Sequence, residues 1–314
     1  EYGIAQVSMN ITDIRATPLH KAFDEVSRAA AARGLRVTGT EIVGLVPKSA
    51  ILDAGRHYLR MQQRSLGIPE KEIVKIAVKS MGLDDLKPFV AEEKIIEDML
   101  RKPADGLVDL TARGFADETA SESPAPGGGS ISAYMGALAA ALGTMVANLS
   151  AHKPGWDDRW EEFSDYAVKG RLCMERLLSL VDEDTDAFNR IMAVFAMPKN
   201  TPEEKAARSE ALQRATVNAI EVPLRTMQAA YDTFDILEYM AANGNPASVS
   251  DAGVGALAAR AAVLGASLNV RINAEGLKDK ELAARYIRQA EEIVAKAVEK
   301  ETHILGIVNK VISQ

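Results

Sequence analysis

The sequence has a single cysteine, Cys173, among its 314 residues, so no disulfide can form within the chain. This fits a reducing compartment, and we expect a cytoplasmic protein. The four histidines are scattered and no Cys or His pair has metal-site spacing, so no metal is expected. Lys and Arg total 37 against 44 Asp and Glu, a net charge of -7 that leaves no basic excess for binding nucleic acid.

Long uninterrupted apolar runs are also missing. No stretch approaches the roughly 20 apolar residues that a membrane-spanning helix needs, and no segment has the pattern of a signal peptide. We therefore expect no membrane partner. Hydrophobic residues nevertheless make up 47% of the chain, which is ample for a globular core, and the length is consistent with two domains.

The first hundred residues have a mixed pattern. Segments 4–11 and 35–46 resemble strands, and helical patterns lie between and after them. Two strands cannot close a sizeable sheet, so we expect a small α/β unit that pairs with another strand-bearing unit. The chain opens without an initiator Met inside the first of these segments, which leads us to expect a further segment upstream.

The rest of the chain has a helical pattern without a convincing strand. We expect an all-α bundle of about five long helices, which makes the fold α+β overall. Thr201 and Glu204 have the spacing of a capping box at a helix start. Pro223 is expected to kink or break the helix that follows. The last helix is expected at about 279–312.

Two of these helices consist mostly of Ala, Gly and other small residues, and each follows a polar loop. PAPGGGS at 124–130 precedes the first, and GNPASVSD at 244–251 precedes the second, with Ser250 as the expected N-cap. Small residues let helices pack closely, in a core or across a dimer interface. The N–H groups of a helix N-terminus also bind anions, so two converging N-termini would form an anion-binding pocket.

An acidic segment, VDEDTDAFNR at 181–190, lies within a helical pattern although Asp is a poor helix former. Asp184 shares a helix face with Phe188, which directs the carboxylate toward the core. A buried carboxylate is costly unless it is paired or functional, so Asp184 is a candidate functional group. A solvated acidic face with one satisfied inward carboxylate is the alternative.

Together these segments resemble a family of folate enzymes. PAPGGGSISA, VDEDTDAF followed by MPKNTPEEK, and SVSDAGVGAL followed by NVRIN resemble the cyclodeaminase and methenyltetrahydrofolate cyclohydrolase family, in the right order over most of residues 108–314. AQVSMNITDIRATPLHKAFDEV and VTGTEIVGLVPKSAILDA resemble the C-terminal subdomain of glutamate formimidoyltransferase. This order is that of the bifunctional formimidoyltransferase-cyclodeaminase family of histidine degradation.

The resemblance implies a transferase subdomain at 1–102 and an all-α cyclodeaminase domain at 103–314. The family's first transferase subdomain, which carries its catalytic His, has no counterpart in this sequence. The transferase region is therefore expected to be inactive unless a separate chain or a lost segment supplies that subdomain.

The implied reaction converts 5-formimidoyltetrahydrofolate to 5,10-methenyltetrahydrofolate and ammonia. The tetrahydrofolate derivative, which can be polyglutamylated, is then the substrate, and no metal or redox cofactor is needed. The family places an essential Asp in the acidic segment, which favours Asp184 as the base, with Asp182 as the second candidate. The resemblance also suggests a homo-oligomer, at least a dimer. The candidate substrate-binding residues lie in or near the two polar loops and the second small-residue helix: Gly127, Gly128, Gly129, Ser130, Lys153, Asn245, Ser250, Asp251, Asn269 and Asn273.

Two other functions remain open. A methenyltetrahydrofolate cyclohydrolase would handle water at the same methenyl carbon, in the reverse sense. A non-catalytic folate-binding or oligomer-forming helical scaffold would also suit small-residue helices and an amphipathic last helix.

Overall fold

The computed structural model describes residues 5–100 and 106–313. The chain divides into two compact units, Glu1–Pro103 and Ala104–Gln314. Each unit has a hydrophobic core of its own.

The first unit is built from short helices. They are α1 (Leu19–Ala31), α2 (Lys48–Met61), α3 (Glu70–Ser80), α4 (Ala91–Lys94) and α5 (Ile96–Met99). Helices α2 and α3 pack on each other through fully buried residues such as Ile51 and Ala77. This core is the reason why the unit is compact despite its small size.

The strands expected at 4–11 and 35–46 are not formed within the described residues. The one β-type contact there is an isolated parallel bridge between Val46 and Ile95. A strand needs a neighbouring strand to bond its N–H and C=O groups, and the described part of this unit offers none. Apolar side chains of both segments remain exposed, for example Val7 and Val43. The expected α/β unit is therefore a helical unit with two extended segments.

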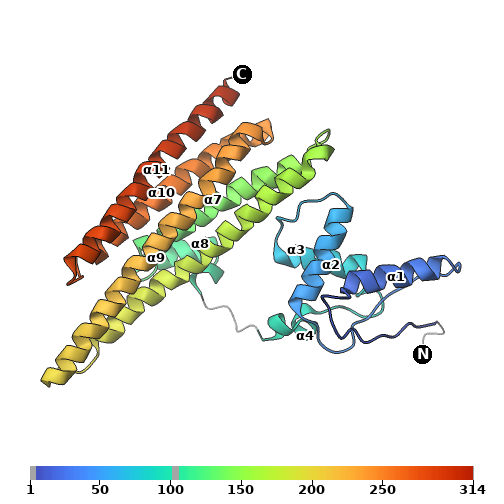
Figure 1. The fold of residues 1–314 in the computed structure, drawn as a ribbon, viewed down its shortest axis with the longest axis horizontal. Helices are drawn as coiled ribbons and strands as arrows, with labels where there is room; N and C mark the ends of the chain where they lie inside the picture. The colour runs from blue at the N-terminus through green and yellow to red at the C-terminus, as the bar shows by residue number, and fades with distance from the viewer. Residues whose placement is uncertain (1–4, 101–105, 314) are drawn as a thin grey trace. The chain divides into compact units, whose positions relative to one another are not determined.

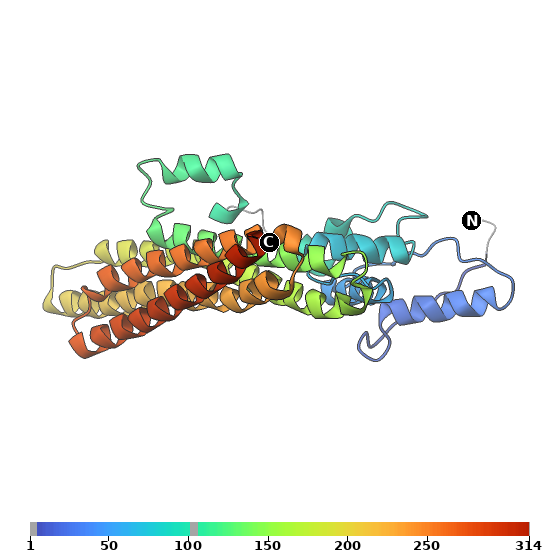
Figure 2. The ribbon, with the colours of Figure 1, turned by 90° about the horizontal axis from the view of Figure 1, so that it is seen from above.

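The second unit is the expected bundle of five long helices. They are α7 (Gly128–Ala151), α8 (Trp160–Phe195), α9 (Pro202–Asn243), α10 (Val249–Ala274) and α11 (Lys280–Ile312), and they lie side by side (Figures 1 and 2). The short helices of this unit are η1 (Leu107–Asp109), α6 (Ala112–Thr119), η2 (Asp157–Arg159) and η3 (Pro246–Ser248).

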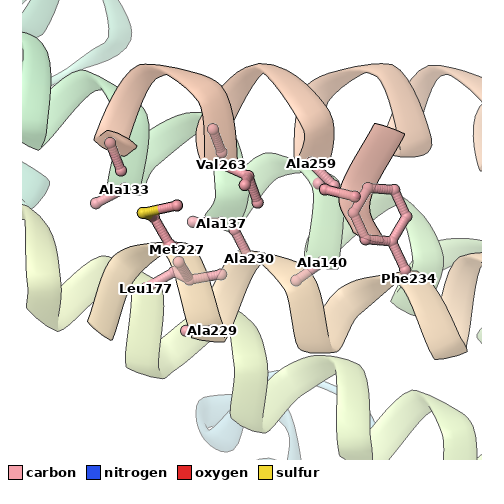
Figure 3. Close-up of a cluster of buried hydrophobic side chains, with 14 of the residues drawn as sticks. Ala133, Ala137, Ala140, Leu177, Met227, Ala229, Ala230, Phe234, Ala259 and Val263 are labelled. Carbon is pink, nitrogen blue, oxygen red and sulfur yellow. The ribbon is translucent and has the colours of Figure 1, made fainter. Parts of the chain in front are cut away.

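Small residues allow α7 and α10 to pack closely against each other. Ala133, Ala137 and Ala140 of α7 face Ala259 and Val263 of α10, and all five are buried (Figure 3). Larger side chains from the neighbouring helices fill the remaining space: Leu177, Met227 and Phe234. The alanines let the two helices approach closely, and the larger side chains of the neighbouring helices fill the space beside them. Together they give the packing density of a folded core.

Three local signals of the sequence have different outcomes in α9 and α10. The capping box is confirmed, because the Glu204 N–H donates to Thr201 Oγ1 and the Thr201 N–H donates to Glu204 Oε2, both at 3.2 Å. Pro223 does not break its helix, since α9 runs without interruption from Pro202 to Asn243. The N-cap expected at Ser250 is wrong: α10 begins at Val249, directly after the turn of η3.

Two described helices are long and apolar enough to cross a membrane, although the sequence was expected to contain no such run. They are Gly128–Ala151 and the stretch Pro246–Ala274, whose most apolar windows are 61% and 50% buried within the bundle. Core helices of a bundle pass the same test of length and composition. The finding is therefore weak evidence for a membrane span.

Candidate functional site

A small cavity lies where the start of α7 meets α8, α9 and α10. Its volume is about 140 Å³. The residues that line it come from four separate stretches of chain: Pro124, Ala125, Gly127, Gly128, Gly129, Asp184, Thr185, Ala187, Phe188, Ile191, Ala219, Asn269 and Asn273. Asp184 carries the one charge among these lining side chains.

The Asp184 carboxyl group lies against the first turn of α7. Ser130 Oγ donates to Asp184 Oδ2 at 3.0 Å, and the Ser130 backbone N–H also donates to this carboxyl group. A Cβ atom added to Gly129 would lie 2.5 Å from the Asp184 carboxyl carbon, so a residue without a side chain is needed here. Burial raises the pKa of Asp184, and the two hydrogen bonds from Ser130 partly oppose that rise.

This geometry gives the glycine loop a specific role. A helix N-terminus attracts negative charge through its free N–H groups and its dipole. At the N-terminus of α7 the anion is a side chain of the same chain, the Asp184 carboxylate. The glycines of the loop permit this approach, and the open side of the carboxyl group faces the cavity.

The Ser130 hydroxyl group can serve either protonation state of Asp184. Ser130 Oγ is 3.1 Å from the Val181 carbonyl oxygen as well as 3.0 Å from Asp184 Oδ2. When Asp184 is ionised, the hydroxyl group donates to the carboxylate. When Asp184 is protonated, the acid donates to Ser130 Oγ and the hydroxyl group turns to Val181. A proton can thus be gained or lost at Asp184 without leaving a buried polar atom unpaired.

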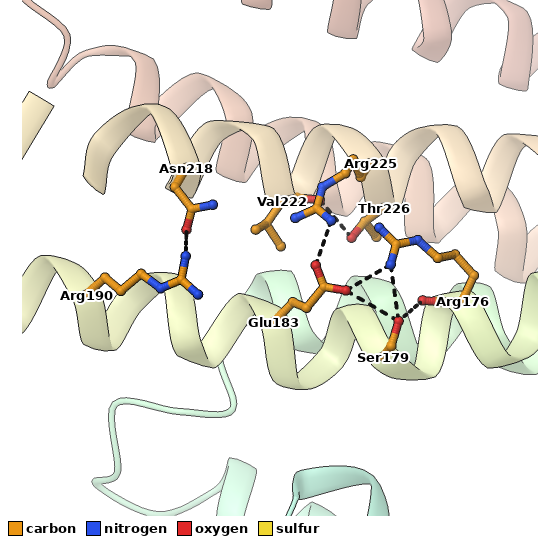
Figure 4. A network of polar contacts seen from close by, with 8 residues as sticks. All are labelled: Arg176, Ser179, Glu183, Arg190, Asn218, Val222, Arg225 and Thr226. Atoms are coloured by element: carbon orange, nitrogen blue, oxygen red, sulfur yellow. Dashed lines mark hydrogen bonds and ion pairs between the residues drawn. The ribbon is translucent and has the colours of Figure 1, made fainter. Parts of the chain in front are cut away.

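The other carboxylates of the acidic segment have structural contacts or face solvent. Asp182 Oδ1 accepts the Leu107 N–H at 2.8 Å and so holds the start of η1. Glu183 forms an ion pair with Arg176 of the same helix at 2.9 Å, and a second one with Arg225 at 2.6 Å joins α8 to α9 (Figure 4). Asp186 is exposed. Asp184 is therefore the carboxylate of this segment that lines the cavity.

Two amide side chains of α10 also line the cavity. Asn269 Nδ2 donates to the Gly265 carbonyl at 3.1 Å within the same helix. Asn273 Nδ2 donates across to the Ala219 carbonyl of α9 at 2.7 Å. Ala219 lies four residues before Pro223, which has no N–H to offer that carbonyl. Asn273 supplies the missing donor, and in this way α9 continues past its proline.

Four of the candidate binding residues lie at the other end of the bundle. The Asn245 N–H donates to Ser150 Oγ at 2.8 Å, near the C-terminus of α7. The Lys153 ammonium group lies 3.9 Å from the centre of the Trp156 ring. Ser250 and Asp251 belong to the first turn of α10. None of these four residues lines the cavity.

The expected convergence of two helix N-termini is therefore wrong. Gly128 at the start of α7 lies beside Asn269 near the end of α10, because the two helices run antiparallel. Their N-termini are separated by the length of α7, about 36 Å for 24 residues. The cavity instead brings together Gly127, Gly128 and Gly129 with Asn269 and Asn273, and Ser130 reaches it through Asp184.

Several residues of the site were not singled out in the sequence. Ile191 and Ala219 line the cavity without belonging to a recognisable motif, and Thr185 lines it from within the acidic segment at 181–190. A signal was available for Ala219, since a proline inside a helix leaves the carbonyl four residues earlier without its usual donor. A wider hollow of about 610 Å³ lies between α8 and α9 and contains none of the predicted site residues. Among the residues that the structure describes, no group of three or more His, Cys, Asp and Glu side chains is placed to hold a metal ion.

Comparison with known proteins identifies similar chains for both units. The family model described as Formiminotransferase-cyclodeaminase matches residues 111–292, and the Formiminotransferase domain model matches residues 1–101. Formimidoyltransferase-cyclodeaminase of Gallus gallus is 35% identical over 312 residues, which cover 99% of this chain and 58% of that protein. The chain thus spans somewhat more than half the length of this relative.

Two further similarities concern the helical bundle. Methenyltetrahydrofolate cyclohydrolase of Methylorubrum extorquens is 37% identical over 187 residues, covering 60% of this chain and 90% of that protein. The crystal structure of formiminotetrahydrofolate cyclodeaminase from Thermotoga maritima matches with a TM-score of 0.57 and 27% identity, over 65% of this chain and 98% of that one. The bundle therefore has a cyclodeaminase-like helical fold.

Proposed function

Because the chain belongs to the formiminotransferase-cyclodeaminase family, we propose that its helical bundle is a formimidoyltetrahydrofolate cyclodeaminase. The reaction closes 5-formimidoyltetrahydrofolate to 5,10-methenyltetrahydrofolate and releases ammonia. One observation carries the proposal: a partly buried carboxyl group with a raised pKa, Asp184, lines the small cavity described above. A carboxyl group whose pKa is raised is suited to both accepting and returning a proton.

Asp184 has a role in each step of the proposed reaction. N10 attacks the carbon of the protonated amidine, a new N–C bond forms, and Asp184 accepts the N10 proton. The bond from that carbon to the NH2 nitrogen then breaks, and Asp184 returns the proton to this nitrogen, which leaves as NH3 while the positive charge stays on the methenyl product. In its ionised form Asp184 also stabilises the cationic amidinium and methenyl groups. The two hydrogen-bonding arrangements of Ser130 support this exchange of a proton.

A change at Ser130 is expected to move the pH dependence of the reaction. The Ser130 hydrogen bonds lower the pKa of Asp184, so Ser130→Ala should raise that pKa further. Because the ionised form acts as base, the acidic limb of kcat/KM should shift to higher pH. The measurement is a pH–rate profile of wild type and variant. Ser132→Ala is the matched control, since Ser132 Oγ donates to the Gly128 carbonyl and not to Asp184. A limb that stays in place in Ser130→Ala would contradict this role.

The alternative reaction is that of a methenyltetrahydrofolate cyclohydrolase, which the similarity to the Methylorubrum protein favours. The two can be separated by offering the protein each substrate in turn and following methenyl absorbance. Faster formation of methenyl product from the formimidoyl substrate supports the cyclodeaminase. Faster hydrolysis of the methenyl compound, with no conversion of the formimidoyl substrate, would show a cyclohydrolase and contradict the cyclodeaminase proposal. If the protein acts on neither substrate, the non-catalytic helical scaffold is the remaining hypothesis.

For the first unit we infer a formimidoyltransferase C-terminal subdomain at 1–102, with the cyclodeaminase domain at 103–314. The two extended segments of the first unit would be strands of a mixed sheet that is completed by chain outside the described residues. The exposed apolar side chains of Val7, Val43 and Leu45 support this, because they would be covered by such a sheet. A folate carrying one or more glutamates would be the ligand shared by both activities.

We further propose a homodimer through α7 and α10. These neighbouring helices leave large apolar side chains exposed in stripes whose members lie three, four, seven or eleven residues apart: Leu138, Met145 and Leu149 in α7, and Val254, Leu257, Leu268 and Ile272 in α10. Stripes with this spacing are typical of packed helix faces. A second copy offers the same two stripes and suits a two-fold interface.

A negative charge placed in the apolar stripe of each helix tests the proposed dimer. Leu138→Glu combined with Leu257→Glu should convert the protein to a monomer in sedimentation, because a carboxylate on each helix would be desolvated at the interface. Leu172→Glu on α8 is the control, since Leu172 is 67% exposed and lies outside the stripes. A wild-type monomer, or an intact dimer in the double variant, would contradict this interface.

A further inference from the structure

Three polar atoms at the cavity have no partner among the described residues. The first is Thr185 Oγ1, which is buried. A threonine in a helix usually bonds the carbonyl four residues earlier, but the Thr185 hydroxyl group forms no such bond to Val181. The Thr185 hydroxyl group is thus left for something inside the cavity.

The other two atoms are the amide oxygens of Asn269 and Asn273. Each Nδ2 atom donates to a backbone carbonyl, of Gly265 and Ala219 respectively. These bonds fix which way each amide is turned and leave each Oδ1 as an acceptor without a donor. Together with Asp184, the wall therefore presents acceptor atoms from three side chains.

The orientation of Asn273 depends on a residue outside the cavity. Pro223 cannot donate to the Ala219 carbonyl, and Asn273 takes that place at 2.7 Å. A residue with an N–H at position 223 would satisfy the carbonyl from within α9. Pro223 is thus the reason why Ala219 needs an outside donor and why the Asn273 amide is held across the two helices.

The size of the cavity limits what these acceptors can contact. A volume of about 140 Å³ holds several water molecules, and the cavity opens to solvent, so only one end of a larger ligand such as a folate fits inside it. The cavity accommodates a head group of a few atoms. Acceptor oxygens and one carboxylate match a cationic head group with N–H donors, such as a protonated amidine. A formyl group of the same shape presents a carbonyl oxygen where the imino group has an N–H, and this oxygen would face the two asparagine oxygens without a proton between them.

We propose that Asn269 and Asn273 select the imino form of the one-carbon group over the formyl form. The inference rests on the proposed function, and it names the feature of the substrate that the site recognises. A site built to bond a particular N–H rejects an analogue that lacks it, because its own polar atoms are then left unpaired.

The test compares two ligands in four proteins, which are wild type, Pro223→Ala, Asn273→Leu and the double variant. KM is measured for 5-formimidoyltetrahydrofolate, and the inhibition constant is measured for 5-formyltetrahydrofolate as a competitor. Wild type should bind the imino ligand about ten- to a hundredfold more tightly than the formyl ligand. Pro223→Ala should keep this preference, because a carbonyl can accept two bonds and Asn273 still reaches Ala219.

Asn273→Leu alone would leave the Ala219 carbonyl without a donor and should lower the melting temperature. The double variant Pro223→Ala with Asn273→Leu restores an N–H donor from within α9, so its melting temperature should recover. The preference for the imino ligand should stay about tenfold weaker than in wild type, because only Asn269 remains to select it. This combination separates recognition of the ligand from support of the fold.

Two results would overturn the inference in different ways. If the double variant turns over substrate and keeps the wild-type ratio of constants, Asn273 has no part in selection, while the proposed function stands. If wild type neither binds nor turns over 5-formimidoyltetrahydrofolate, the proposed function and the inference fail together.

Discussion

Replacing Asp184 with asparagine should lower turnover of 5-formimidoyltetrahydrofolate about a thousandfold or more. Asparagine has nearly the same shape but cannot accept the N10 proton or carry the charge that stabilises the cationic intermediate. Asp184 is also the one charged side chain among the described cavity residues, so no neighbour can take its place. Turnover is measured from the absorbance of the methenyl product under saturating substrate.

The same variant should fold at least as well as wild type. Burial raises the folded pKa of Asp184 above its ordinary value of 3.8, so the folded state binds a proton more tightly than the unfolded state. At pH values below the pKa of Asp184 in the unfolded state, the group is protonated in both states and does not reduce the free energy of unfolding. As pH rises through the folded pKa, the ionised group reduces stability. Above that window Asp184→Asn should therefore unfold at equal or higher denaturant concentration than wild type.

Asp182→Asn is the matched control for this prediction. Its side chain holds the Leu107 N–H rather than the cavity, so the change should weaken the attachment of η1 and leave most of the turnover. Retained turnover in Asp184→Asn, or a loss of turnover in Asp182→Asn equal to that in Asp184→Asn, would contradict the assignment of the base.

Gly129→Ala should abolish most of the activity, with a loss of about a hundredfold or more. The new methyl group would overlap the Asp184 carboxyl group, whose carbon is 2.5 Å from the Cβ position. The carboxyl group must then move away from the Ser130 hydrogen bonds and from its place at the cavity. Misplacing a catalytic group by about 1 Å is enough for a loss of this size. The measurement is kcat/KM together with the melting temperature.

Gly128→Ala tests whether the effect is specific to that contact. A Cβ at Gly128 would lie 3.6 Å from Asn269 Nδ2, an ordinary van der Waals contact. Neither position requires a positive φ, so alanine at either one fits the helical start of α7. Gly128→Ala should therefore keep activity within a few fold of wild type. Equal losses in the two variants would show that the loop needs glycine for another reason.

The helices of the bundle could be predicted because their signals are local. A capping box at Thr201 and Glu204, and long apolar periodicity, depend on residues a few positions apart. The inward direction of Asp184 followed in the same way from its i,i+4 relation to Phe188. These features need no knowledge of how helices are arranged.

The errors concern contacts between distant segments. Alternation at 35–46 resembled a strand, but pairing depends on a neighbouring strand that the described residues do not supply. The loops at 124–130 and 244–251 looked equivalent, although the antiparallel packing of α7 and α10 places them at opposite ends of the bundle. Pro223 looked like a break, because its compensating donor, Asn273, lies fifty residues further along the chain.

The central claim is that the cavity at Asp184 releases the imino nitrogen of a formimidoyl folate as ammonia. The most direct measurement gives the protein 5-formimidoyltetrahydrofolate with an isotopic label on that nitrogen, and quantifies labelled ammonia and methenyl product together. Equal amounts of the two products from wild type, and neither above background from Asp184→Asn, are the predicted result. Methenyl product without labelled ammonia, or equal yields from both proteins, would contradict the claim.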